Sequence, residues 1–151
     1  RDNDASGQYL CEALKENGHN LVGYEIERDD LYLLRARVSI WIASPEVEVI
    51  LITGGTGFTS RDSTPEAVEP LLDSRIDGFG ELFRAVSYEE IGTSTLQSRA
   101  VGGMANGTLV FCIPGSPGAC KTAWLKILKD QLDINHRPCN FAELIPRLRE
   151  R

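Results

Sequence analysis

The amino-acid sequence predicts an α/β domain: a three-layer arrangement with helices on both faces of a mostly parallel sheet, which also includes a β-hairpin. Helical and strand patterns alternate in the first half of the chain, and such alternation requires crossover connections between parallel strands. Two strand patterns end in glycine-rich turns that lead into helices, and Asn106-Gly107 separates two short strand patterns. The 151 residues fit one domain, so we expect a single unit over residues 1–151.

The chain begins with the patterns of a helix and a strand. Polar, turn-like residues 1–7 precede apolar positions at helical spacing, and Ser6 is a candidate N-cap. The pair Asn17-Gly18 is typical of a helix end, because glycine readily takes the left-handed conformation there. Residues 21–26 alternate enough between apolar and polar side chains that we expect them to form a strand.

A longer helix and the main strand follow. Asp29 or Asp30 is expected to cap the helix, which carries many apolar residues and closes at Ser44-Pro45. Residues 47–52 are a nearly unbroken apolar and largely β-branched run. Such a run is typical of a strand that is buried on both faces of a parallel sheet.

The segment GGTGFTSRD, residues 54–62, follows this strand directly. Gly54, Gly55 and Gly57 lack side chains, so the backbone can take positive φ angles and a ligand can approach its amides closely. Thr56 adds a hydroxyl donor within the same turn. A strand, a glycine turn and a helix N-terminus together predict an anion site at the carboxyl end of the sheet.

The helix after this loop is expected to have Thr64 as its N-cap and Pro65 at its first position. Asp62 stands where a magnesium ion or a substrate hydroxyl would meet it, because a carboxylate in a phosphate loop is costly without a cation. Two alternatives stay open. The loop is a tight turn without a ligand, since it matches no diagnostic glycine motif, or Asp62 is an ordinary cap of the helix.

The second half is expected to continue with helices around a hairpin. A break in the helical pattern falls at residues 77–81, and the pair Asn106-Gly107 is the strongest hairpin signal in the chain. The expected elements are helices at residues 65–72, 82–90, 119–132 and 141–148, and strands at residues 100–104 and 108–113.

A second glycine turn, Pro114 to Gly118, connects the last expected strand to a helix. Two strand-to-helix glycine turns in one small sheet are typical of a topological switch point, where ligands bind beyond the strand ends. Gly115, Ser116 and Pro117 are therefore candidate binding residues. Ser116 lies in no nucleophile motif and has no histidine near it in sequence, so we expect it to donate a hydrogen bond.

Other polar residues in turns have both a functional and a structural interpretation. Asp29 lies at a strand-to-helix junction, where it contacts a ligand or caps the helix. Glu81 binds a ligand from the GFGE turn or occupies the first turn of the next helix. Ser98 and Arg99 precede the hairpin, and Arg99 either clamps a phosphate or carboxylate or forms a surface ion pair.

Composition excludes several classes of function. The net charge of −6 argues against a nucleic-acid surface, which needs a clustered basic face. The four cysteines form no metal or redox motif, so we expect small buried side chains of a reduced cytoplasmic protein. No apolar run reaches membrane-spanning length and no signal peptide is present, so no membrane partner is expected.

Four motifs in order carry a resemblance that spans essentially the whole chain: TGGTGFTSRDSTPEA, GFGELFR, EEIGTSTLQSRAVGG and IPGSPGACKTAW. Together they resemble the MogA/MoaB molybdopterin adenylyltransferases, and the segment GTSTLQSRA is more similar to the MoaB branch. The resemblance implies one molybdopterin-binding domain that transfers AMP from Mg-ATP to molybdopterin and releases pyrophosphate. Because the MoaB branch includes members poorly equipped for catalysis, a non-catalytic paralogue that binds molybdopterin or a partner protein is the alternative.

The resemblance also assigns residues by position. Asp62 and Asp29 match catalytic acidic positions, and Asp62 is also the implied Mg²⁺ ligand. The implied binding residues for ATP and molybdopterin are Gly54, Gly55, Thr56, Gly57, Glu81, Ser98, Arg99, Gly115, Ser116 and Pro117.

Two further expectations concern the chain's start and its assembly. Family members begin with a strand that leads into a DxSG motif, and here only DASG at residues 4–7 is left, so we expect a fragment that lacks this strand. Phe79, Phe83 and Phe141 lie in segments too short to bury them all, which indicates an interface. The resemblance implies a homo-oligomer, a trimer or a hexamer.

Overall fold

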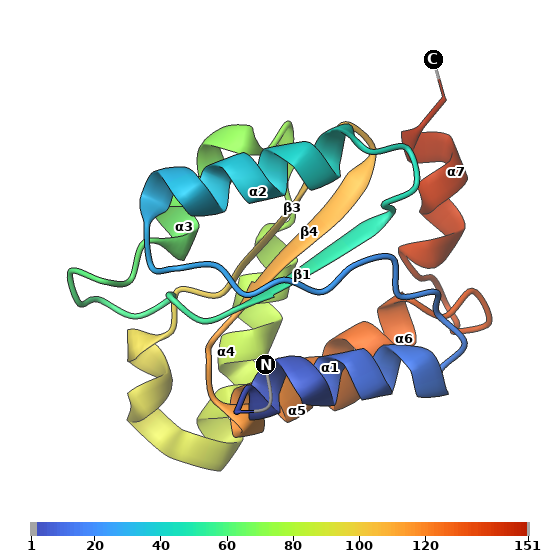
Figure 1. Cartoon of the computed structure of the whole chain (residues 1–151). Helices are drawn as coiled ribbons and strands as arrows, with labels where there is room; N and C mark the ends of the chain where they lie inside the picture. Colours follow the sequence, from blue (N-terminus) through green and yellow to red (C-terminus); the bar gives the residue numbers. More distant parts are fainter. Residues whose placement is uncertain (1–2, 151) are drawn as a thin grey trace.

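The structure, a computed structural model, describes residues 3–150 and has the expected α/β architecture (Figure 1). A four-stranded sheet lies between two helical layers, with α2 and α3 on one face and α1, α4, α5 and α6 on the other. No helix within the described residues is long and apolar enough to cross a membrane. The elements are α1 Ala5–Glu16, α2 Leu31–Ala43, β1 Val49–Thr53, α3 Thr64–Val68, β2 Ser74–Arg75, α4 Asp77–Ile91, β3 Val101–Ala105, β4 Thr108–Ile113, α5 Pro117–Ala123, α6 Lys129–Gln131 and α7 Ile145–Leu148.

The sheet is mixed, with strand order β1-β4-β3-β2. β1 pairs with β4 in parallel, from Val49 opposite Leu109 to Thr53 opposite Ile113. The β3–β4 and β2–β3 ladders are antiparallel. The expectation of a mostly parallel sheet is therefore wrong for the described residues, because the hairpin and the short β2 add antiparallel strands next to a single parallel pair.

The expected strand at residues 21–26 does not form, and residues 19–28 contain no regular structure. This segment runs along the edge of β1 that does not face β4 and lines an open groove between α1 and α2 (Figure 1). Side chains hold it there: Tyr24 Oη donates to Asp4 Oδ2 at 2.5 Å, and Arg37 Nε donates to Glu27 Oε1 at 2.8 Å. Alternation of polar and apolar residues depends only on the side chains, whereas a strand also needs the backbone of a neighbouring strand as its hydrogen-bond partner.

The hairpin prediction is confirmed. β3 and β4 are joined by Asn106 and Gly107, whose φ angles are 52° and 75°. Positive φ at both central residues is the geometry of a type I′ turn, which matches the right-handed twist of the flanking strands. Thr108 follows with its hydroxyl donating to Val47 O at 3.0 Å, which ties the start of β4 to the segment before β1.

The helix N-termini differ from expectation by a few residues. Asp4, and not Ser6, caps α1, since its Oδ1 accepts from Gly7 N–H at 3.0 Å. Asp30, and not Asp29, caps α2 by accepting from two backbone N–H groups at 2.9 Å each. Each of these aspartates directly precedes the first helical residue, where the first-turn amides converge on its carboxylate.

Three of the later helices also differ from expectation. The break expected at residues 77–81 is the first turn of α4. The helix expected at residues 119–132 begins at Pro117 and contains a π-helical turn over Trp124–Leu128. The helix expected at residues 141–148 is a 3₁₀ turn followed by the single turn of α7.

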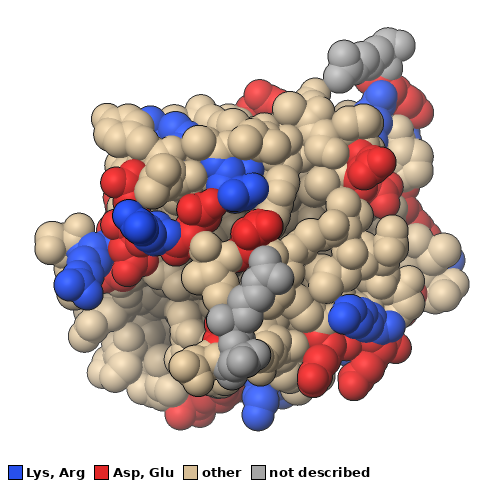
Figure 2. All heavy atoms as spheres, viewed as in Figure 1, with Lys and Arg blue, Asp and Glu red and all other residues tan. Residues whose placement is uncertain are grey.

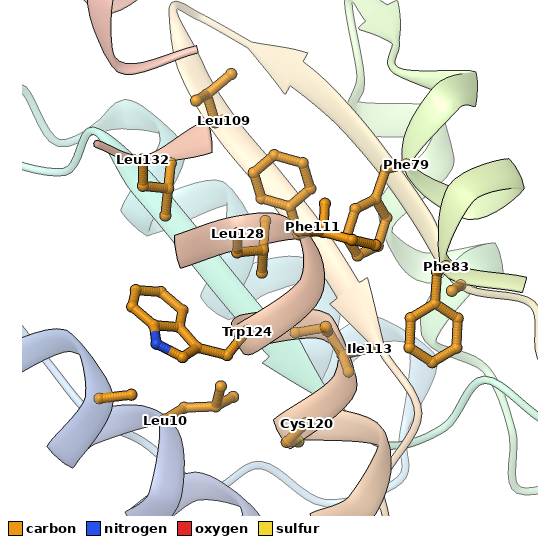
Figure 3. Packing of buried hydrophobic residues seen from close by; sticks show 14 of the residues in the cluster. Leu10, Phe79, Phe83, Leu109, Phe111, Ile113, Cys120, Trp124, Leu128 and Leu132 are labelled. Carbon is orange, nitrogen blue, oxygen red and sulfur yellow. The ribbon is translucent and has the colours of Figure 1, made fainter. Parts of the chain in front are cut away.

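Two hydrophobic clusters fill the spaces on either side of the sheet. The larger one contains Phe111 of β4, Trp124 and Leu128, together with apolar residues of α1 and α4 (Figure 3). The smaller one lies under α2 and α3 and is rich in valine. β4 contributes to both, because it is buried along its whole length.

The expected exposure of Phe79 and Phe83 is wrong, since they are only 3% and 2% exposed. Because α4 begins at Asp77, both rings lie four residues apart on one helical face that packs on the sheet. The Phe79 ring lies 4.9 Å from that of Phe111, centroid to centroid (Figure 3). Phe141 is half-buried against the same cluster.

The four cysteines are free thiols. Cys112 and Cys120 are buried as expected, and burial raises the pKa of both thiols. Cys139 is exposed, so the expectation of a buried side chain is wrong there. It lies in the irregular segment after α6, which the sheet does not cover.

Candidate functional site

The two glycine turns lie side by side at the carboxyl ends of the parallel strands β1 and β4. Gly54 N–H donates to Ile113 O at 2.8 Å, and the Thr53 hydroxyl donates to Pro114 O at 3.0 Å. A Cβ on Gly115 would lie 3.2 Å from Gly54 Cα, so the two backbones approach within contact distance. The structure thus brings together the two turns that the sequence singles out, as expected for ligand sites beyond strand ends.

The first turn has a backbone that only glycine adopts readily. Gly54 and Gly55 have φ angles of 106° and 69°. The Thr64 hydroxyl donates to Gly54 O at 2.8 Å, and Thr64 N–H donates to Gly55 O at 3.0 Å. The expectation that Thr64 is the N-cap is therefore wrong, because Thr64 is the first residue of α3 and its hydroxyl closes the glycine turn.

Gly55→Ala is expected to lower the free energy of unfolding by about 2 kcal/mol, because an L-residue is strained at this φ angle. The added Cβ would also lie 2.3 Å from Thr64 Oγ1, so the contact that closes the turn has to break. Urea denaturation measures the change. Gly78→Ala is the control, since its Cβ meets nothing within 4 Å, and a Gly55→Ala protein as stable as this control would contradict the prediction.

Asp62 stabilises the loop in which it lies. Its Oδ2 accepts from Thr59 N–H at 2.9 Å and from the Thr59 hydroxyl at 2.7 Å. These bonds from Thr59, with a smaller contribution from Gly57 N–H, lower the pKa of Asp62, so the carboxylate is ionised at neutral pH. The alternative that Asp62 caps α3 is wrong, because Ser63 occupies that position and makes no side-chain cap.

The loop carboxylate is compatible with a magnesium ion that is held mainly by a substrate. Within residues 3–150, no three His, Cys, Asp or Glu side chains gather in a way that would hold a metal ion by themselves. Mg²⁺ usually binds through one or two carboxylates together with substrate phosphates. An ionised and partly exposed Asp62 fits this mode.

Arg99 connects the loop to the first turn of α3. Its Nε donates to Gly57 O at 2.9 Å and its Nη2 to Asp62 O at 3.1 Å. The guanidinium also forms an ion pair with Glu66. Of the two interpretations of Arg99, the structure shows the ion pair. This pair joins the loop of residues 57–62 to helix α3, so it belongs to the site.

The remaining candidates lie in different places. Asp29 is exposed and lines the groove of about 850 Å³ between α1 and α2, together with Gly54 and Thr64. Acidic and basic side chains alternate on this face, on the side where the loop before α3 and the start of α2 lie (Figure 2). Glu81 lies within α4 and lines a separate hollow of about 110 Å³, so it is not in a turn. Ser98 Oγ accepts from Ala100 N–H at 3.4 Å.

Ser116 is the N-cap of α5, with Pro117 in the first turn. Its Oγ accepts from Ala119 N–H at 3.1 Å, so in this contact it is an acceptor and not the expected donor. Ser6 at the start of α1 donates to Gly115 O at 2.7 Å and fixes this second turn. Neither this role of Ser6 nor that of Glu66 could be predicted from the sequence, because each depends on a contact between distant segments.

The chain is similar to known proteins both in sequence and in fold. Residues 1–134 match the family described as "Probable molybdopterin binding domain". Over 140 residues the chain is 56% identical to molybdenum cofactor biosynthesis protein B of Escherichia coli strain K12, which covers 93% of this chain and 82% of that protein.

Two solved structures have the same fold. A crystal structure of molybdenum cofactor biosynthesis protein B aligns with a TM-score of 0.88 at 43% identity, covering 98% of this chain and 87% of that one. The tungsten cofactor synthesizing protein MoaB from Pyrococcus furiosus aligns with a TM-score of 0.79 at 36% identity and the same coverage. The chain therefore belongs to the molybdopterin-binding domain family.

Proposed function

We propose that this protein acts in molybdenum cofactor biosynthesis and transfers AMP from Mg-ATP to the terminal phosphate of molybdopterin, with release of pyrophosphate. The observation that carries the proposal is the meeting of two glycine turns beside the ionised Asp62. Family membership supports the pathway, and the four sequence motifs that resemble the adenylyltransferases support the reaction.

The chain's own residues bind and orient the reactants in this proposal. Gly54 N–H and Gly57 N–H bond within the protein, so the amides of Gly55 and Thr56 are the ones that would face the phosphates, as the amides of a strand-to-helix turn do in other phosphate sites. Asp62 would hold Mg²⁺, and residues 115–117 of the second turn would form the opposite wall of the site. Mg²⁺ supplies charge neutralisation when it is bound with ATP. Positioning and electrostatic stabilisation account for most of the rate in phosphoryl and nucleotidyl transfer, so no covalent enzyme intermediate is needed.

The test of this proposal is product formation from molybdopterin and Mg-ATP. We expect pyrophosphate release that depends on both substrates, together with adenylyl-molybdopterin detected by mass spectrometry. Binding of molybdopterin without product would instead select the non-catalytic paralogue.

We also propose that the protein is a homo-oligomer, a trimer or a pair of trimers. Tyr88, Ile91 and Leu96 lie close in sequence at the end of α4 and in the 3₁₀ turn after it, and their exposed fractions are 57%, 55% and 81%. Apolar side chains exposed together usually mark an interface. Light scattering is expected to give three or six times the protomer mass of 16.7 kDa, and the protomer mass alone would contradict this prediction.

A further inference from the structure

The guanidinium of Arg99 is bonded to the protein on nearly all sides. Its Nε–H and one Nη2–H donate to carbonyls at opposite ends of the loop, Gly57 O at 2.9 Å and Asp62 O at 3.1 Å. A second Nη2–H donates to Glu66 Oε1 at 3.2 Å, and Nη1 donates to Glu66 Oε2. Four of the five N–H groups of the fork are therefore engaged.

The backbone N–H of Arg99 and the flat face of its guanidinium also make contacts within the protein. Arg99 N–H donates to Thr56 O at 3.0 Å, within the glycine turn. The guanidinium carbon lies 5.0 Å from the centroid of the Phe58 ring, a distance typical of a cation–π contact. The phenyl ring is itself 69% exposed, so it covers Arg99 on the side toward solvent.

We propose that Arg99 is a positioning residue, which holds the loop of residues 57–62 against α3 in the shape that binds phosphate and does not contact the phosphate itself. The proposal rests on the proposed function of the glycine loop as an anion site. A direct bidentate phosphate clamp needs two free donors on the fork, whereas here the carbonyls and Glu66 occupy four of the five.

The variant Glu66→Gln distinguishes a direct clamp from a positioning role, because the two roles predict opposite changes in anion affinity. If Arg99 were a direct clamp, Glu66 would compete with the anion for the guanidinium, and Glu66→Gln would tighten anion binding. If Arg99 positions the loop, Glu66 is the anchor of the fork on α3, and Glu66→Gln loosens the loop and weakens binding. Glutamine keeps the size of the side chain and removes only its charge, so helix α3 is preserved.

Arg99→Lys is the second variant, because lysine keeps the charge but cannot bridge two carbonyls and a carboxylate at once. Arg137→Lys is a matched control. Arg137 Nη1 donates to Ile134 O at 3.0 Å and to Glu143 Oε1 at 3.0 Å, so it also joins a loop carbonyl to a glutamate. It lies in the segment after α6, away from the glycine turns (Figure 1).

The binding probe is inorganic pyrophosphate with Mg²⁺, measured by calorimetry on the full chain. We expect binding to weaken severalfold in Glu66→Gln and on the order of tenfold in Arg99→Lys, and to stay unchanged in Arg137→Lys. Tighter binding in Glu66→Gln, or wild-type binding in Arg99→Lys, would overturn the proposal in favour of a direct clamp or of no role.

Hydrogen exchange of the ligand-free protein gives an independent readout. In the wild type, Thr59 N–H is bonded to Asp62 Oδ2 and Asp62 N–H to Thr59 O, so both amides are protected. Arg99→Lys is expected to speed exchange in peptides that cover residues 57–62 and to leave the hairpin unchanged. Unchanged exchange at residues 57–62 would show that Arg99 does not position the loop. If the wild type binds neither pyrophosphate nor Mg-ATP, the proposed function fails, while the exchange result still decides the role of Arg99.

Discussion

Asp62→Asn is expected to slow pyrophosphate release on the order of 100-fold or more while the fold stays intact. The amide oxygen of asparagine can still accept from Thr59 N–H and from its hydroxyl, which lie 2.9 Å and 2.7 Å from Asp62 Oδ2. The loop therefore keeps its hydrogen bonds, and only the negative charge is lost. Since that charge is the one that we propose holds Mg²⁺ beside the glycine turns, the rate is expected to fall without a matching loss of stability.

The measurement is the rate of pyrophosphate release at saturating Mg-ATP and molybdopterin, with circular dichroism to check the fold. Asp133→Asn is the matched control, because Asp133 Oδ1 also accepts a backbone N–H in a loop, from Asn135 at 2.8 Å. It lies outside the site, so its activity is expected to equal that of the wild type. Unchanged turnover in Asp62→Asn would remove Asp62 from the catalytic machinery.

Phe111→Ala is expected to lower the free energy of unfolding by about 4 kcal/mol, the largest stability effect that we predict. Phe111 lies in the middle strand pair, is 2% exposed and packs 4.9 Å from the Phe79 ring, centroid to centroid. Its ring also fills the space next to Gly102, where a Cβ would come within 2.9 Å of it. Because the surrounding strand and helix cannot close the space, truncation leaves a cavity in the larger core.

Urea denaturation measures this loss, and Ile134→Ala is the control. Ile134 is 59% exposed, so its truncation is expected to change the free energy of unfolding by no more than about 0.5 kcal/mol. A decrease below about 1 kcal/mol for Phe111→Ala would mean that the cluster around β4 is loosely packed.

Local patterns predicted most of the fold correctly. The type I′ hairpin depends on two adjacent residues, and Asn106 and Gly107 have the positive φ angles that it requires. Gly18, with φ of 81°, lies where the sequence ends α1. The two glycine turns were also found, because glycine after an apolar strand is a signal contained in a few neighbouring residues.

Features that depend on distant contacts could not be predicted from the sequence. The residues at 21–26 have a strand pattern, but no backbone ladder pairs them within the described chain. Phe79 was assigned to a segment too short to bury it, because the glycine-rich sequence at residues 77–81 indicated a break. The structure begins α4 at Asp77, and this helix directs the ring into the core. The anchor of Arg99 on Glu66 joins residues 33 positions apart, which no local spacing reveals.

The unpaired edge of β1 has a consequence for the protein in solution. Within residues 3–150 this strand bonds only to β4, and residues 19–28 run along its other edge without forming a ladder, so a strand from outside these residues or from another molecule can pair there. Glu46 and Glu48 are exposed just before the strand and repel an identical edge. Salt screens such repulsion, so for a protein of these 151 residues rising ionic strength is expected to promote aggregation, seen as turbidity that grows with protein concentration.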